Sequence, residues 1–165
     1  MTDLRHFLTM DELTCDEQAH ILDLAAALKR NPGDYRTRLQ GKTLAMIFQK
    51  KSTRTRVSFE VGMFQLGGHA LFLSSNDIQI GRGETISDTA QVLSRYVDII
   101  MARVYGHSDI EELAQFSTVP VINGLSDLHH PCQVLADLQT VRERFGDLRG
   151  RHLAYIGDGN NMAHS

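Results

Sequence analysis

The chain has 165 residues, of which 42% are hydrophobic and 22% are charged, and its formal net charge is −3. These values are typical of a globular protein and exclude a disordered tail, a collagen and a coiled coil. The slightly acidic balance disfavours a dedicated nucleic-acid-binding protein, and no apolar run is long enough to predict a membrane span. The first residues lack the apolar segment of a secretory signal.

The hydrophobic pattern predicts short strands that alternate with helices. A first helix over 14–29 begins at a capping box of Thr14 and Glu17. Strands are expected at 43–48, 70–73, 98–104, 119–122 and 151–156. Helices are expected at 53–66, at 86–96, after a cap at Ser108, and at 131–145, where Pro131 takes the first helical position.

This order predicts an α/β fold with a doubly wound parallel sheet and helices on both faces. In the helix over 53–66, Val57, Val61 and Phe64 share one stripe and are expected to pack inward. Ligands of such sheets bind beyond the carboxyl ends of the strands. The loops after the predicted strands are therefore the candidate sites.

The loop after the first strand carries the strongest chemical signal. Four of the seven residues from 50 to 56 are cationic, and Ser52, Thr53 and Thr55 add hydroxyl groups. A helix N-terminus presents free N–H groups to an anion, and an arginine such as Arg54 can grip two phosphate oxygens. A phosphate site is predicted, with a solvated basic loop as the alternative. The Walker pattern GxxxxGK[ST] is absent.

Two further positions are candidates at the same sheet edge. His130 and Gln133 stand three residues apart at a predicted helix start, so both can face one side of its first turn. A capping or surface role is the alternative for His130. Arg103 lies in an apolar strand and is expected to reach either solvent or a bound anion. Cys132 has no catalytic partner motif and is expected to pack.

Two glycine-containing segments carry weaker signals. The polar loop over 76–84 predicts a binding loop or a subunit contact, with an ordinary surface loop as the alternative. The GDGNN stretch at 157–161 lacks the full GxGxxG fingerprint, so a nucleotide-binding Rossmann protein is disfavoured. Cys15 and Cys132 are far apart in sequence, which disfavours a disulfide framework and a zinc ribbon and favours a reducing cytoplasm.

Three motifs, in this order, resemble the carbamoyltransferase family: STRTR at 52–56, Arg103, and HPCQ at 130–133. The stretches at 48–60, 78–84, 123–133 and 156–161 are most similar to members that act on L-ornithine. Aspartate-specific members usually carry a lysine in the loop that here reads Gly81-Arg82-Gly83-Glu84. The resemblance covers essentially the whole chain but only about half of a family member.

The resemblance implies transfer of the carbamoyl group of carbamoyl phosphate to the side-chain amine of L-ornithine, giving L-citrulline and phosphate in arginine metabolism. It implies a cytoplasmic homotrimer with active sites between subunits, and neither a metal nor an organic cofactor. Aspartate, putrescine and N-acetylornithine remain alternative acceptors, because the family's acceptor-binding motifs lie in a second domain.

The resemblance also implies roles for individual residues. Arg103 would bridge the phosphate and the carbonyl oxygen, and His130 would donate to that oxygen. Gln133 would contact the carbamoyl amino group, Gln79 would reach the phosphate in a neighbouring subunit's site, and Asn161 would contact the amino acid. The residues that would hold the phosphate are Ser52, Thr53, Arg54 and Thr55.

Two domains are expected on the same ground. Residues 1–149 would form the carbamoyl phosphate-binding domain, and 150–165 the first strand and turn of an amino acid-binding domain that is otherwise missing. The chain is then expected to be inactive by itself. If it truly ends at Ser165, the alternative is a non-catalytic module that binds carbamoyl phosphate or forms trimers.

Overall fold

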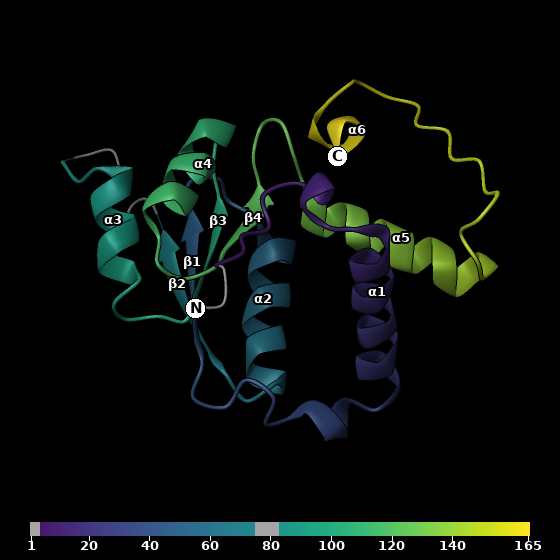
Figure 1. Cartoon of the computed structure of the whole chain (residues 1–165), viewed down its shortest axis with the longest axis horizontal. Coiled ribbons are helices and arrows are strands. Elements are labelled where there is room, and N and C mark those ends of the chain that lie inside the picture. Colours follow the sequence, from purple (N-terminus) through teal and green to yellow (C-terminus); the bar gives the residue numbers. More distant parts are fainter. Residues whose placement is uncertain (1–3, 75–82) are drawn as a thin grey trace.

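A four-stranded parallel sheet lies at the centre of the computed structural model, which describes residues 4–74 and 83–165 (Figure 1). The strands are β1 (Thr43–Phe48), β2 (His69–Ser74), β3 (Ile99–Arg103) and β4 (Val121–Leu125). Their order across the sheet is β2-β1-β3-β4, and every neighbouring pair is parallel. The predicted α/β fold class is confirmed.

The helices follow the strands as the sequence predicts. They are α1 (Cys15–Arg30), α2 (Thr53–Gln65), α3 (Ile86–Leu93), α4 (His107–Phe116), α5 (Pro131–Phe145) and the short α6 (Asn161–His164), with 3₁₀ turns η1 (Met10–Glu12) and η2 (Pro32–Tyr35). The capping box before α1 is confirmed, since the Glu17 N–H donates to Thr14 Oγ1 at 3.3 Å. The cap expected at Ser108 is wrong: α4 begins at His107, with Gly106 at the N-cap position.

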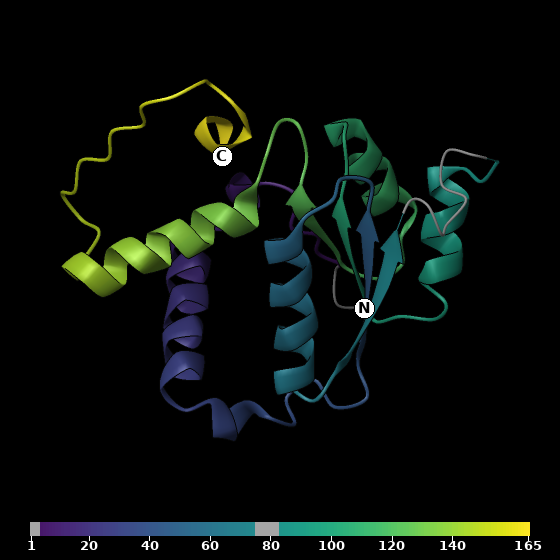
Figure 2. The same ribbon diagram turned by 180° about the vertical axis from the view of Figure 1, so that it is seen from behind.

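Helices cover both faces of the sheet, as Figures 1 and 2 show from opposite sides. Alternate residues of β1 point to opposite faces. Ala45 and Ile47 pack with residues of α3 and α4, whereas Leu44, Met46 and Phe48 pack with Met63 of α2. Parallel sheets are stable when both faces are buried in this way.

The predicted apolar stripe of α2 does not pack on the sheet. Val57, Val61 and Phe64 are exposed, Phe64 by 80%. The buried contacts come instead from Phe59 and Met63, which lie four residues apart on the other side of the helix. Two apolar stripes of similar strength run along α2, and the position of the sheet selects the one that packs.

The fifth strand predicted at 151–156 is absent. These residues are irregular, and Leu153 and Ile156 are 86% and 96% exposed. A strand needs a neighbour for its backbone groups, but the outer edge of β4 is already occupied by Phe7, which exchanges two 2.8 Å hydrogen bonds with Val121 and Asn123. The segment loops away from the sheet beyond α5 (Figure 1). Among the described helices, none is both long and apolar enough to cross a bilayer.

Candidate functional site

The loop after β1 ends in a well-formed helix N-terminus. Ser52 is the N-cap of α2, and its Oγ accepts from the Thr55 N–H at 3.3 Å and donates to Thr55 Oγ1 at 3.0 Å. The N–H groups of Thr53 and Arg54 have no intrahelical acceptor at this end of a helix. The terminus therefore offers N–H groups, hydroxyl groups and the positive end of the helix dipole to an anion.

Arg103 projects toward this terminus from the end of β3. It pairs in register with Phe48, so both side chains lie on the α2 side of the sheet. A β-bulge helps to set this direction, because Arg103 pairs with Leu125 after Gly124 is skipped. A Cβ on Gly124 would lie 2.5 Å from Met101 Sδ, so a larger residue has no room there.

The Arg103 guanidinium is half-buried and lacks a carboxylate partner among the described residues. Its Nη1 donates weakly to Thr55 Oγ1 at 3.5 Å, and its buried Nε has no protein partner in the described part of the chain. Burial lowers the pKa of Arg103 from its ordinary value. Buried donors of this kind are normally satisfied, so the geometry points to an anionic ligand.

The cations of the loop have different surroundings. Arg56 pairs with Glu60 at 3.3 Å and lies over the Phe72 ring, and Lys50 lies 4.9 Å from the centre of the Tyr105 ring. Arg54 forms no ion pair with any residue that the structure describes. Arg54 is thus the loop arginine left available for a ligand, and its role in phosphate binding stays a prediction.

Two cavities flank the N-terminus of α2. One of about 1020 Å³ is lined by residues that include Lys50, Ser52 and Thr53. The other, of about 280 Å³, brings the loop together with the start of α5, and its lining consists of Arg54, Thr55, Ser58, Phe59, Gly124, His130, Cys132, Gln133 and Ala136. The structure thus brings Arg54 and Thr55 of the STRTR motif to one cavity with the HPCQ motif, whereas Ser52 and Thr53 line the other cavity.

His130 is the N-cap residue of α5 and faces this cavity. Burial, and then the nearby Arg103 charge, lower the pKa of His130, while Asp137 raises it. The ring is therefore neutral at neutral pH, so one ring nitrogen is a donor and the other an acceptor. Its buried Nδ1 has no partner among the described residues.

The remaining predicted site residues differ in how near they lie to the small cavity. Gln133 lines the small cavity, and its side chain donates to Asp137 at 2.9 Å. Asn161 lies in α6 and donates to the Ser126 carbonyl oxygen at 2.6 Å, so it contacts the loop that carries His130. Gln79 lies outside the described residues.

Gln49 joins the site although the sequence did not single it out. Its Oε1 accepts from the Tyr105 N–H at 2.9 Å, and its Nε2 donates to Asp109 at 3.1 Å. Its own N–H donates to the Arg103 carbonyl oxygen at 2.9 Å. Gln49 therefore ties the loop after β1 to the end of β3. A polar residue after a buried strand was the only available signal.

Cys132 packs, in agreement with its predicted role. It is half-buried, and its Sγ donates to the Asn123 carbonyl oxygen at 3.4 Å. Burial raises the pKa of the Cys132 thiol to about 12. A thiol that remains protonated is a poor nucleophile, so Cys132 has no covalent role in this arrangement.

The fold and the site together define a class of protein. At the carboxyl ends of its strands, a parallel α/β sheet carries an N-capped helix terminus, a half-buried Arg103 and a neutral His130. Arg54 lies there too, without an ion pair to any residue in the described ranges. Each of these groups favours an anion that bears a polarised carbonyl or phosphoryl oxygen. This arrangement is typical of a domain with a site for a small anion such as a phosphate group.

Comparisons with known proteins agree with this class. The family model for the aspartate/ornithine carbamoyltransferase, carbamoyl-P binding domain, matches residues 5–143. The chain is 63% identical over 163 residues to an ornithine carbamoyltransferase of Anoxybacillus flavithermus. That match covers 98% of the chain and 52% of the relative. The chain therefore spans about half the length of the curated relatives it matches.

Two solved structures extend this finding. The ornithine carbamoyltransferase of Pyrococcus furiosus superposes with a TM-score of 0.94 at 58% identity, over 98% of this chain and 52% of that one. An acetylornithine transcarbamylase complexed with acetylcitrulline superposes with a TM-score of 0.80 at 37% identity, over 90% of this chain and 51% of that one. The chain belongs to the aspartate/ornithine carbamoyltransferase family, within its carbamoyl phosphate-binding domain.

Proposed function

We propose that this chain is the carbamoyl phosphate-binding half of an enzyme that carbamoylates the side-chain amine of L-ornithine. The products are L-citrulline and phosphate. The observation that carries the proposal is the half-buried Arg103, whose Nε has no protein partner in the described chain and whose Nη1 contacts Thr55 at the α2 terminus. A dianionic phosphate at this place satisfies both groups.

The geometry supports separate roles for these residues in the reaction. Ser52, Thr53, Arg54 and Thr55 hold the phosphate group, and Arg103 reaches between the phosphate and the carbonyl oxygen. The uncharged amine nitrogen attacks the carbonyl carbon, the carbon–oxygen bond to phosphate then breaks, and the proton that the nitrogen loses passes to the departing phosphate. The carbonyl oxygen carries negative charge in the tetrahedral intermediate. Each well-aimed donor lowers the barrier by about 3–4 kcal/mol.

His130 acts as a neutral hydrogen-bond donor to the carbonyl oxygen. A neutral ring fits this task, because the nearby Arg103 already supplies positive charge and disfavours a second cation. Gln133, which lines the same cavity, contacts the carbamoyl amino group. No covalent intermediate is required, since phosphate is a good leaving group and the two substrates need chiefly to be positioned.

Ornithine is the proposed acceptor because of the relatives. The names of the curated relatives at 63%, 61% and 59% identity specify ornithine, whereas the acetylornithine enzyme is 37% identical. We assign Asn161 to the amino acid side of the site. Its contact with Ser126 places α6 beside the His130 loop. Aspartate, putrescine and N-acetylornithine are the alternative acceptors.

The proposal extends to organisation and location. We propose a carbamoyl phosphate-binding domain over 1–149, with 150–165 as the beginning of an amino acid-binding domain. We also propose a homotrimer in which Gln79 reaches a neighbour's phosphate, and a cytoplasmic location that agrees with the free Cys15 and Cys132. Analytical ultracentrifugation tests the trimer. The proposal predicts a sedimenting species with three times the 18.5 kDa mass of the chain.

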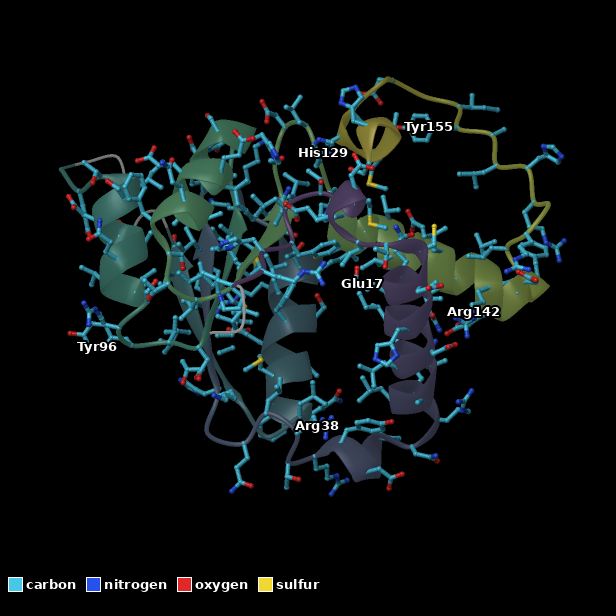
Figure 3. The ribbon with its side chains drawn as sticks, viewed as in Figure 1. Glu17, Arg38, Tyr96, His129, Arg142 and Tyr155 are labelled. Carbon is cyan, nitrogen blue, oxygen red and sulfur yellow. The ribbon has the colours of Figure 1, made fainter. Side chains whose placement is uncertain are left out.

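Titration calorimetry with carbamoyl phosphate tests the binding site. The chain should bind carbamoyl phosphate, and Arg54→Ala should weaken binding by about a hundredfold, because an unpaired arginine is lost from an anion site. The control is Arg38→Ala, which should leave binding unchanged. Arg38 is an exposed arginine in the turn before β1 and lies beside the end of α2 that is remote from the site (Figure 3). Equal weakening in both variants, or none in Arg54→Ala, contradicts the assignment.

A further inference from the structure

A buried polar network lies directly behind His130. Asn123 and Ser126 are fully buried, and His107 is 9% exposed. Ser126 Oγ lies 2.8 Å from His107 Nδ1, and Asn123 Nδ2 donates to the Leu8 carbonyl oxygen at 2.9 Å. Buried polar groups are costly unless they are paired. A network at this depth therefore fixes the backbone that it contacts.

The network converges on one carbonyl oxygen, that of His129. This oxygen accepts from the Ser126 N–H at 2.9 Å, from Ser126 Oγ at 3.3 Å and from Asn123 Nδ2 at 3.4 Å. The His129 N–H donates back to Ser126 Oγ at 3.1 Å. Ser126 thus closes a tight turn with His129. Figure 3 labels His129 on the loop between β4 and α5.

The same peptide group is held at its other end. The His130 N–H, which belongs to the peptide bond that follows the His129 carbonyl, donates to Ser165 Oγ at 2.8 Å. Pro131, the next residue, is fully buried and restricts the backbone of His130. The direction of the His130 side chain is therefore set by the plane of this peptide, which Ser126 anchors.

We propose that Ser126, supported by Asn123 and His107, is a positioning residue that aims His130 into the cavity it shares with Arg54 and Thr55. The inference rests on the proposed function, because it assigns Ser126 a role through a residue that contacts carbamoyl phosphate. Ser126 does not line that cavity. The Ser126 side chain is therefore expected to act on carbamoyl phosphate through the peptide group between His129 and His130.

Comparison of two ligands separates this role from general stability. Inorganic phosphate contacts the α2 terminus and does not require His130, whereas carbamoyl phosphate presents a carbonyl oxygen to it. Ser126→Ala should weaken carbamoyl phosphate binding by about tenfold and change phosphate binding by less than about twofold. Ser126→Cys, which has a somewhat larger side chain and forms weaker hydrogen bonds, should shift binding in the same direction by less.

A double-mutant cycle tests whether the effect passes through His130. In the His130→Ala background, Ser126→Ala should cause no further loss of carbamoyl phosphate affinity, because its target is gone. The control is Ser117→Ala, another buried and hydrogen-bonded serine, which packs against α3 and contacts Ser94. This control should leave both affinities unchanged. Calorimetry is performed well below the melting temperature of each variant.

Three results would overturn the inference. The first is an equal loss of affinity for carbamoyl phosphate and for phosphate in Ser126→Ala and Ser126→Cys. The second is additive losses of affinity in the double-mutant cycle. The third is an unchanged carbamoyl phosphate affinity in Ser126→Ala. A wild-type chain that binds phosphate but gains nothing from the carbamoyl group would overturn the proposed function as well. Binding that Arg54→Ala abolishes but Ser126→Ala leaves intact overturns the inference alone.

Discussion

Ser52 combines two roles that substitution can separate. Its Oγ caps α2 and lies where the phosphate is proposed to bind. Ser52→Ala removes the cap and should lower the free energy of unfolding by about 1 kcal/mol. Ser52→Asp keeps a good capping acceptor but adds a negative charge, so stability should hold while carbamoyl phosphate binding is lost. Urea unfolding and calorimetry measure the two effects, and retained binding in Ser52→Asp would contradict the site.

The two cysteines should differ in reactivity. Cys15 is exposed, whereas burial raises the pKa of the Cys132 thiol to about 12. Because the thiolate is the reactive form, Ellman's reagent should titrate one thiol in the folded chain and two after denaturation. A Cys15→Ser variant should then show no fast reaction, and a fast reaction in that variant would contradict the packing of Cys132.

For individual residues, the sequence predicted which side chains belong to the candidate site better than it predicted the residues that they contact. The cationic loop and its cap were readable because Ser52 and the arginines stand next to a helix start. The Gln49 contacts and the Asn123–Ser126 network were not readable. They join segments far apart in the chain, and a single polar residue within an apolar run does not reveal its partner.

Among the elements, α2 shows why periodicity alone was insufficient. Val57, Val61 and Phe64 form a regular stripe, yet Phe59 and Met63 are the residues that pack on the sheet. Both sets satisfy helical spacing. The bounds of β1 and α5 were predicted closely, because a buried apolar strand and a proline at the first helical position are strong local signals.

The N-terminal segment should respond to acid. His6 Nδ1 accepts from the Val121 N–H at 3.2 Å, beside the Phe7 bridge to β4. Burial lowers the pKa of His6, although Glu12 raises it. Below the ordinary histidine pKa of 6.5 the unfolded chain then binds more protons than the folded one. The free energy of unfolding should therefore fall as pH falls from about 7 to about 5.

A substitution isolates this contribution. His6→Asn keeps an acceptor near the Nδ1 position without a titratable ring. It should reduce the pH dependence measured by urea unfolding without abolishing it, because burial also lowers the pKa of His129 and His130. His20→Asn, at an exposed histidine of α1, is the matched control and should keep the wild-type slope. If the free energy of unfolding depends on pH equally in the wild type and in His6→Asn, protonation of His6 does not contribute to the loss of stability in acid.

For the whole molecule, the segment after α5 marks the limit of what the sequence could show. Residues 151–156 have the composition of a buried strand but are irregular and exposed. Composition records a preference for a sheet, whereas formation of a strand requires a neighbouring edge. In the described chain the β4 edge is taken by Phe7.

Citrulline formation by a completed enzyme is the most direct test of the proposed function. The chain is fused to the second half of the Pyrococcus furiosus ornithine carbamoyltransferase, whose first half it matches at 58% identity. We predict that the fusion makes citrulline from carbamoyl phosphate and ornithine, and that Arg54→Ala in the fusion abolishes it. A folded fusion that makes no citrulline, while the intact Pyrococcus enzyme makes it in the same assay, would contradict the proposed function.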